Sequence, residues 1–209
     1  MAQIEVEYIG EISEERFSEL RELFEKKGKF KKEKKRLSFM YFRDSIPKDI
    51  GEIKDEPVDL RFRVTNKQPE IILKYGIFDA SHARKEISIE FSSEESERYI
   101  EFLKCLGWHL GVIYATHTLT YEYNGIEFAL AEIKGYGYNF EAEILTDDSN
   151  VVEAKKKIEQ ELKVLGIKPF DEQGLNKQCN VVNNKKELQF DFNKTSFEEI
   201  KERFKEFFD

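Results

Sequence analysis

Apolar and charged residues alternate along several short segments of the chain, a pattern that predicts β-strands with one dry face and one wet face. The clearest example runs from Val58 to Tyr75, where two alternating segments flank a polar Asn-Lys-Gln-Pro turn and predict a β-hairpin. Because successive side chains of a strand point to opposite faces, Arg61 and Arg63 share one face. Lys74 of the second segment joins them if the register of the hairpin allows.

The alternation recurs in three further segments, whose charged faces carry Glu5 and Glu7, then Arg84 and Glu86, then Glu141 and Glu143. If all these strands belong to one sheet that curls on itself, the charged faces line the concave side and helices cover the apolar outside. We therefore expect an α+β fold in which an antiparallel β-barrel encloses a polar tunnel.

Helical spacing of apolar residues predicts three helices, near residues 13–28, 92–107 and 151–165, each ended by a glycine. A second hairpin is predicted to turn at Asn124-Gly125. The C-terminal tail, from Lys168 onward, predicts a short helix within residues 170–182, a short strand at 188–192 and a final amphipathic helix from Thr195.

The composition indicates one domain over residues 1–209, with 40% hydrophobic and 36% charged residues. The formal charge of −8 argues against general nucleic-acid binding. Charge is unevenly distributed, however, because the segment from Lys26 to Arg36 is strongly basic. Such a run is typical of a solvated loop or an edge strand, and the alternative is a patch that attracts an anionic substrate.

The two cysteines, Cys105 and Cys179, have no spacing typical of a disulfide scaffold or a zinc site. No apolar run is long enough to span a membrane, and the chain enters a charged strand directly at its start. We expect a cytoplasmic protein with no membrane partner.

Taken in order, the charged segments resemble the CYTH superfamily, the triphosphate tunnel metalloenzymes that include class IV adenylyl cyclases and thiamine triphosphatases. The resemblance covers about residues 3–165 and leaves residues 168–209 as a C-terminal helical extension. It rests on Glu5-Val-Glu7, Arg61-Phe-Arg63, Lys74, Arg84-Lys-Glu86 and the segment from Gly135 to Glu143. It implies an eight-stranded antiparallel tunnel, a substrate site at Arg61, Arg63, Lys74, Arg84 and Glu86, and a metal site at Glu5, Glu7, Glu141 and Glu143.

The chemistry of these side chains agrees with that implication. Carboxylate oxygens suit Mg²⁺ or Mn²⁺, while the planar fork of arginine and the point charge of lysine suit phosphate oxygens. The expected function is divalent-cation-dependent binding and hydrolysis of an organic triphosphate or tripolyphosphate. The alternatives are an adenylyl cyclase-like reaction, or a module that binds a triphosphate or an RNA 5′-triphosphate end without turnover. No catalytic residue is assigned, and the oligomeric state is open.

The sequence departs from the pattern of the superfamily in three places, one of which is a pair of residues. Ile9 stands where a lysine is expected after the first acid pair. Thr116 and Thr118 stand where a basic pair is expected, with His117 between them pointing the other way. Ala131 stands where an aspartate is expected. One basic wall of the tunnel is therefore predicted to be thin.

Overall fold

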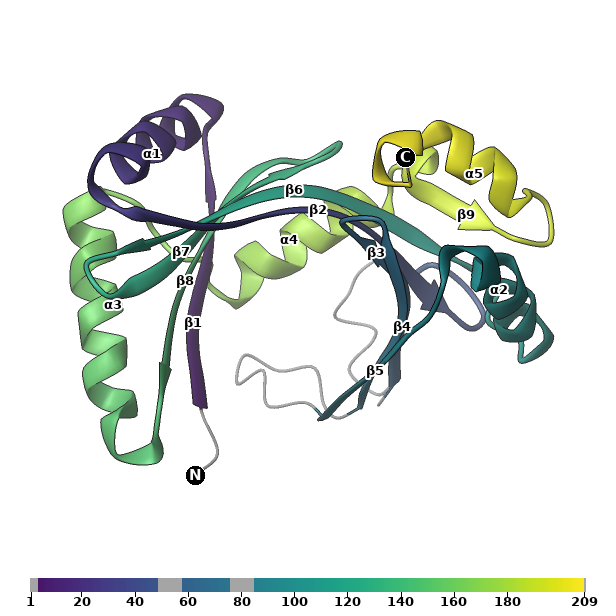
Figure 1. The fold of residues 1–209 in the computed structure, drawn as a ribbon, viewed down its shortest axis with the longest axis horizontal. Coiled ribbons are helices and arrows are strands. Elements are labelled where there is room, and N and C mark those ends of the chain that lie inside the picture. Colours follow the sequence, from purple (N-terminus) through teal and green to yellow (C-terminus); the bar gives the residue numbers. More distant parts are fainter. Residues whose placement is uncertain (1–3, 49–57, 76–84, 209) are drawn as a thin grey trace. The chain divides into compact units, whose positions relative to one another are not determined.

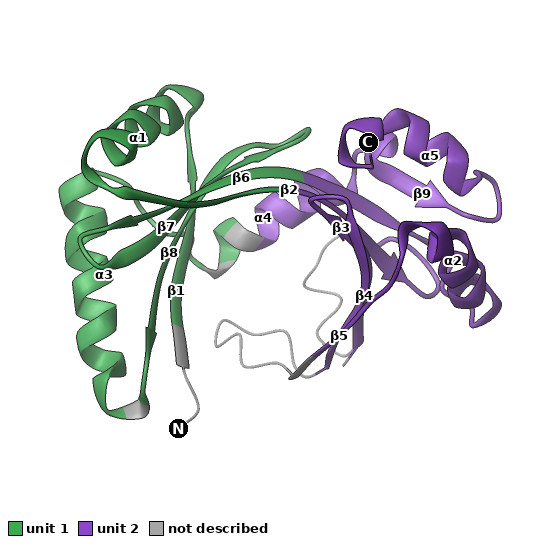
Figure 2. Cartoon of the chain, viewed as in Figure 1, with its two compact units in different colours: residues 1–34, 116–175 green, residues 35–115, 176–209 purple. Residues whose placement is uncertain are grey.

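The computed structural model of the protein describes residues 4–48, 58–75 and 85–208 (Figure 1). The chain divides into two compact units (Figure 2). Unit 1 contains residues 1–34 and 116–175, and unit 2 contains residues 35–115 and 176–209. The expectation of a single domain over residues 1–209 stays a prediction.

The described strands form one antiparallel sheet in the order β1-β8-β7-β6-β2-β3-β4-β5, with β9 beside β6. The strands are β1 (Ile4–Ile12), β2 (Lys29–Phe42), β3 (Val58–Thr65), β4 (Gln68–Tyr75), β5 (Lys85–Glu90), β6 (Leu110–Tyr123), β7 (Ile126–Ile133), β8 (Gly137–Thr146) and β9 (Gln189–Asp191). The α-helices are α1 (Glu14–Lys27), α2 (Ser96–Cys105), α3 (Val151–Leu165), α4 (Glu172–Asn183) and α5 (Phe197–Arg203). This arrangement confirms the α+β class. Among the described strands, hydrogen bonding leaves β1 and β5 as the two ends of the sheet.

In unit 1, one face of the sheet is apolar and packs against α1 and α3. Leu20 and Phe24 of α1 are fully buried, and the ring centroids of Phe24 and Phe128 lie 4.9 Å apart. Ile158 of α3 is buried in the same cluster. Each such side chain contributes about 1.5–3 kcal/mol when it leaves water. The opposite face of the same strands carries the acidic residues.

In unit 2, aromatic residues from the end of the chain pack on the apolar face of the sheet. The ring of Phe39 in β2 lies 5.5 Å from that of Phe190 in β9, and Phe62 in β3 lies 5.7 Å from Phe197 in α5. All four rings are buried. The C-terminal extension therefore supplies part of the core of unit 2.

Local signals set the ends of helices and hairpins as the sequence predicted. The Ser13 hydroxyl caps α1 by accepting a hydrogen bond from the backbone of its third residue at 3.1 Å. Gly166 ends α3 in the left-handed region, with φ at 65°. The turns at residues 66–67 and 124–125 have positive φ at both positions, as a type I′ hairpin turn requires.

One expectation about the sheet was wrong. The basic run was expected in a loop or an edge strand, but β2 begins at Lys29 and lies between β6 and β3 in the strand order. Helices pack on the apolar face of the sheet in both units, as expected, but Ile87 and Ile89 of β5 are 54% and 53% exposed. Pairing within the sheet, rather than local propensity, therefore places the lysine-rich segment in a strand.

Cys105 is exposed, Cys179 is partly buried, and both are free thiols. Among the described residues, no helix has the length and apolar character that a membrane crossing requires. The cytoplasmic location stays a prediction.

Candidate functional site

A row of glutamates lies on the face of unit 1 opposite its apolar core. Glu7 of β1 is the direct partner of Glu143 of β8, and Glu143 is the direct partner of Glu127 of β7. Two residues further along β1, Ile9 is the partner of Glu141. Directly opposite residues have Cβ atoms about 5 Å apart, so these carboxylates share one patch of the sheet. We call Glu7, Glu127, Glu141 and Glu143 the acidic face.

The acidic face contains the three predicted metal ligands whose side chains are described, Glu7, Glu141 and Glu143. Glu5 belongs to β1, but its side chain lies outside the described residues. Among the described side chains, no three acidic, histidine or cysteine groups are close enough together to hold an ion. Like charges on opposite residues repel, and carboxylate oxygens are the donors that Mg²⁺ and Mn²⁺ prefer. The donor type therefore suits a hard divalent cation, and the assignment of these residues as metal ligands stays a prediction.

Glu127 was missed by the sequence reasoning. Its carboxylate pairs with the ammonium group of Lys32 at 3.0 Å. A signal was present, because Glu127 and Glu143 are equally far from the Gly135 turn that joins their strands (135 − 127 = 143 − 135). Counting outward from that turn would have placed the two acids opposite each other.

In unit 2, β3 presents Arg61 and Arg63 on one face and buries Phe62 and Val64 on the other, as predicted. The arginine side chains are only 19% and 13% exposed. Charged groups at this level of burial need partners, and each arginine has a carboxylate.

Arg61 is held by Asp59, which shares its face of β3. The Nε and Nη2 atoms of Arg61 donate to the two carboxylate oxygens of Asp59 at 2.8 and 2.6 Å. This two-pronged contact fixes the plane of the guanidinium group. Lys74 of β4 is the direct partner of Asp59, so the register places this lysine on the same face as the arginines, as the hairpin prediction required.

Arg63 is held by Glu70, its direct partner across the hairpin. The Arg63 Nε donates to Glu70 at 2.8 Å, and the Ser88 hydroxyl donates to the other oxygen of that carboxylate at 2.6 Å. Burial by itself raises the pKa of Glu70, but the hydrogen bonds from Arg63 and Ser88 and the nearby positive charges outweigh it and lower the pKa. Glu70 is therefore ionised at neutral pH. We call Arg61, Arg63 and Lys74 the cationic face.

The side chains of two predicted substrate residues, Arg84 and Glu86, are not among the described ones. Glu86 is the direct partner of Lys74 in β5, but its side chain lies outside the described residues. Arg84 itself lies outside the described residues. Both stay predictions.

Tyr114 and Cys179 lie beside Arg61, a placement that no sequence pattern predicts. Tyr114 of β6 hydrogen-bonds to the Cys179 thiol of α4, and the charge of Arg61 acts on both groups. Burial, reinforced by Cys179, raises the pKa of Tyr114, and burial also raises the pKa of Cys179. Both groups therefore stay neutral at physiological pH.

The three departures from the superfamily pattern lie on the acidic side of unit 1. Ile9 faces Glu141, and β1 continues past it to Ile12, so the alternative that Ile9 ends the first strand is wrong. Thr118 is the direct partner of Ala131. His117 points to the other face, where its Nε2 lies 2.6 Å from a carboxylate oxygen of Glu33. No described group at these three positions supplies the missing charge.

Comparison with known proteins identifies the fold. No protein-family model matches the chain, and no curated protein matches it in sequence. Solved structures do match. A protein from Pyrococcus horikoshii is 25% identical, and the match covers 80% of this chain and 93% of that chain with a TM-score of 0.59.

Two further solved structures match the chain at lower sequence identity. An adenylate cyclase candidate from Vibrio parahaemolyticus is 12% identical, and its match covers 83% of this chain and 97% of that chain with a TM-score of 0.56. HpAC1 from Hippeastrum, an adenylyl cyclase candidate with a dominant triphosphatase activity, is 16% identical over 84% of this chain and 95% of that chain, with a TM-score of 0.55. The chain therefore has a CYTH-like fold, as its charged segments implied.

Proposed function

We propose that this protein binds an organic triphosphate or inorganic tripolyphosphate together with Mg²⁺ or Mn²⁺ and hydrolyses a phosphoanhydride bond. The observation that carries the proposal is the register that puts Glu7, Glu143 and Glu127 directly opposite one another. This register gathers carboxylate oxygens, the donors that a hard divalent cation prefers, on one patch of the sheet. The CYTH-like fold supports the same class of ligand.

The acidic face is the proposed metal site. Glu5, Glu7, Glu141 and Glu143 would hold the ion, and Glu127 lies close enough along the register to join them. A bound divalent cation neutralises charge on phosphate oxygens and polarises the phosphorus for attack. The carboxylates of this chain orient that ion and keep it in place.

The cationic face is the proposed phosphate site. Arg61, Arg63 and Lys74 would bind phosphate oxygens, together with Arg84 and with Glu86 as a positioning partner. Asp59 and Glu70 already hold both guanidinium groups in fixed planes, so little rotamer freedom is left to lose when a phosphate arrives. Because each arginine is already paired, a phosphate must bind alongside its acid or displace it.

Hydrolysis is favoured over cyclisation. HpAC1 shows a dominant triphosphatase activity despite its adenylyl cyclase name, and it shares this fold. The second candidate, a module that binds a triphosphate without efficient turnover, is favoured by Ile9, because the resemblance implies a lysine at this position on the acidic side.

A panel assay tests the proposal and separates the two candidates. Phosphate release is measured from tripolyphosphate, thiamine triphosphate and ATP with Mg²⁺, with Mn²⁺ and with EDTA. Metal-dependent release supports the hydrolase. Metal-dependent thermal stabilisation by a triphosphate without release supports the binding module, and the absence of both results contradicts the proposal.

A further inference from the structure

The alternation of β2 is broken inside unit 1. The Phe30 ring packs edge-on against Tyr121 with centroids 5.6 Å apart, and Glu33 pairs with His117 at 2.6 Å. Tyr121 and His117 are four residues apart on β6, so they share a face. Phe30 and Glu33 are three residues apart, and in a regular strand they would point to opposite faces. One extra residue between them, a β-bulge, accounts for both contacts.

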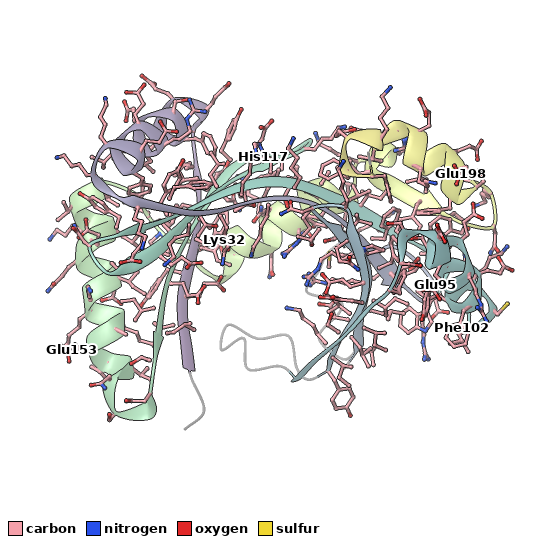
Figure 3. All side chains as sticks on the ribbon, viewed as in Figure 1. Lys32, Glu95, Phe102, His117, Glu153 and Glu198 are labelled. Atoms are coloured by element: carbon pink, nitrogen blue, oxygen red, sulfur yellow. The ribbon has the colours of Figure 1, made fainter. Side chains whose placement is uncertain are left out.

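The bulge turns two consecutive lysines toward the acidic side of the sheet. The Lys31 ammonium lies 3.1 Å from Glu122, and the Lys32 ammonium lies 3.0 Å from Glu127. Glu122 and Glu127 are direct partners across β6 and β7, so the two lysines reach the same face. Figure 3 shows Lys32 and His117 on opposite sides of the β2 and β6 ribbons, in agreement with this assignment.

We propose that the bulged Lys31-Lys32 pair is a phosphate-binding site, which takes one phosphate group of the substrate next to the metal-binding carboxylates. The inference rests on the proposed function and names cations that the superfamily pattern does not predict. It explains how unit 1 can bind a phosphate although Ile9 and Thr118 stand at positions where basic residues are expected. Lysine binds phosphate as a point charge and does not need the fixed geometry of arginine.

The lysines are accessible enough to exchange partners. The side chains of Lys31 and Lys32 are 37% and 46% exposed, and those of Glu122 and Glu127 are 48% and 34% exposed. Ion pairs at this exposure are weak, whereas a triphosphate brings several charges at once. A metal drawn to Glu127 and its neighbours would also weaken the hold of that carboxylate on Lys32.

A purely structural role predicts a different outcome. If Lys32 only neutralises Glu127, then removal of the Lys32 charge makes the folded protein less stable and leaves phosphate binding unchanged. If Lys32 binds phosphate, then removal of its charge weakens phosphate binding while the acidic face attracts a divalent cation at least as strongly as before. The two ligands therefore respond in opposite directions only under the proposal.

The experiment measures Mn²⁺ binding alone and tripolyphosphate binding at saturating Mn²⁺, for the full chain. The variants are Lys31→Gln, Lys32→Gln, the double variant, the charge-retaining Lys32→Arg and the control Lys155→Gln, an exposed lysine of α3. We expect the double variant to bind tripolyphosphate about tenfold more weakly or worse, with an Mn²⁺ affinity equal to or higher than that of the parent. Lys32→Arg and Lys155→Gln should stay within about twofold of the parent.

Two results would overturn the inference while leaving the proposed function in place. One is a double variant with the tripolyphosphate affinity of the parent, and the other is a parallel loss of Mn²⁺ and tripolyphosphate affinity in a destabilised protein. If the double variant does not fold, the same comparison is made with the single variants. A parent protein that binds Mn²⁺ but no tripolyphosphate would instead contradict the proposed function itself, and the inference with it.

Discussion

Glu143→Gln is the change that most clearly separates stability from function, because Glu143 has a glutamate directly opposite on each side. At a carboxylate separation of roughly 6 Å, each pair repels by about 0.7 kcal/mol at a dielectric constant of 80 and by about 2.8 kcal/mol at 20. Measured cross-strand effects of about 0.2–1 kcal/mol favour the lower value. Lys32 also reduces the repulsion from Glu127. Glu7 and Glu143 also have favourable contacts that offset part of this repulsion. We therefore expect Glu143→Gln to change the stability of the metal-free protein by no more than about 1 kcal/mol, or about 2–4 °C in Tm.

The same substitution should remove most of the stabilisation that a metal provides. Mn²⁺ at a hundred times its Kd stabilises the parent by about 2.7 kcal/mol if it binds only the folded state. If the loss of one carboxylate raises Kd about a hundredfold, the same Mn²⁺ concentration leaves about 0.4 kcal/mol. Thermal unfolding with Mn²⁺ and with EDTA measures both effects. Glu153→Gln, an exposed acid of α3, serves as the control and should retain the full metal shift.

A Glu143→Gln protein that keeps the full Mn²⁺ shift, while Glu153→Gln keeps it as well, would show that Glu143 does not contribute to a metal site.

Three further predictions concern other parts of the chain. Arg63→Ala should lower the free energy of unfolding by about 2 kcal/mol, because it leaves the half-buried Glu70 without its charged partner. It should also remove most of the increase in Tm that tripolyphosphate gives the parent. An equal increase in Arg63→Ala and in the exposed-site control Arg98→Ala would contradict this prediction. Tyr8→Phe should reduce the fall in the free energy of unfolding at alkaline pH, since burial and the Glu159 carboxylate raise the pKa of Tyr8 from 10.0 to about 12. The stability linked to the protonated phenol is complete below pH 10 and is lost as the pH rises toward 12, so unchanged alkaline unfolding would count against this assignment. Asp191→Asn should reduce the loss of stability at acid pH, because Lys194 and His109 help to lower the pKa of Asp191 from 3.8 to about 2. The stability linked to the ionised carboxylate is present above pH 3.8 and is lost as the pH falls through 2. An acid unfolding curve that matches the parent would argue that Asp191 does not help to hold β9 in place.

The sequence predicted the faces of single strands because side-chain alternation is a local property. Arg61 and Phe62 must point to opposite faces in any strand, wherever that strand pairs. The two-residue turn at 66–67 then fixes the register of the β3–β4 hairpin, so Lys74 could be placed from residues close in the chain. These parts of the candidate site follow from short-range chemistry.

Other parts of the site depend on features that alternation hides. Glu127 joins the row only through the register of β7 and β8, which the turn at Gly135 sets. Lys31 and Lys32 reach one face because a bulge interrupts the alternation, and a pattern of period two assigns them to opposite faces. The packing of the C-terminal tail was hidden in the same way. Local spacing predicted a strand and a helix in the tail, but the packing of Phe190 on Phe39 is a long-range contact that no local pattern encodes.

The proposed function requires a divalent cation and a triphosphate to bind to this protein together. Calorimetric titration with tripolyphosphate, once premixed with one equivalent of Mn²⁺ and once in EDTA, measures this coupling. We expect binding at least about tenfold tighter with Mn²⁺, a coupling of about 1.4 kcal/mol, and the loss of most of that difference in Glu143→Gln. Equal affinity for tripolyphosphate with Mn²⁺ and with EDTA in the parent protein would contradict it.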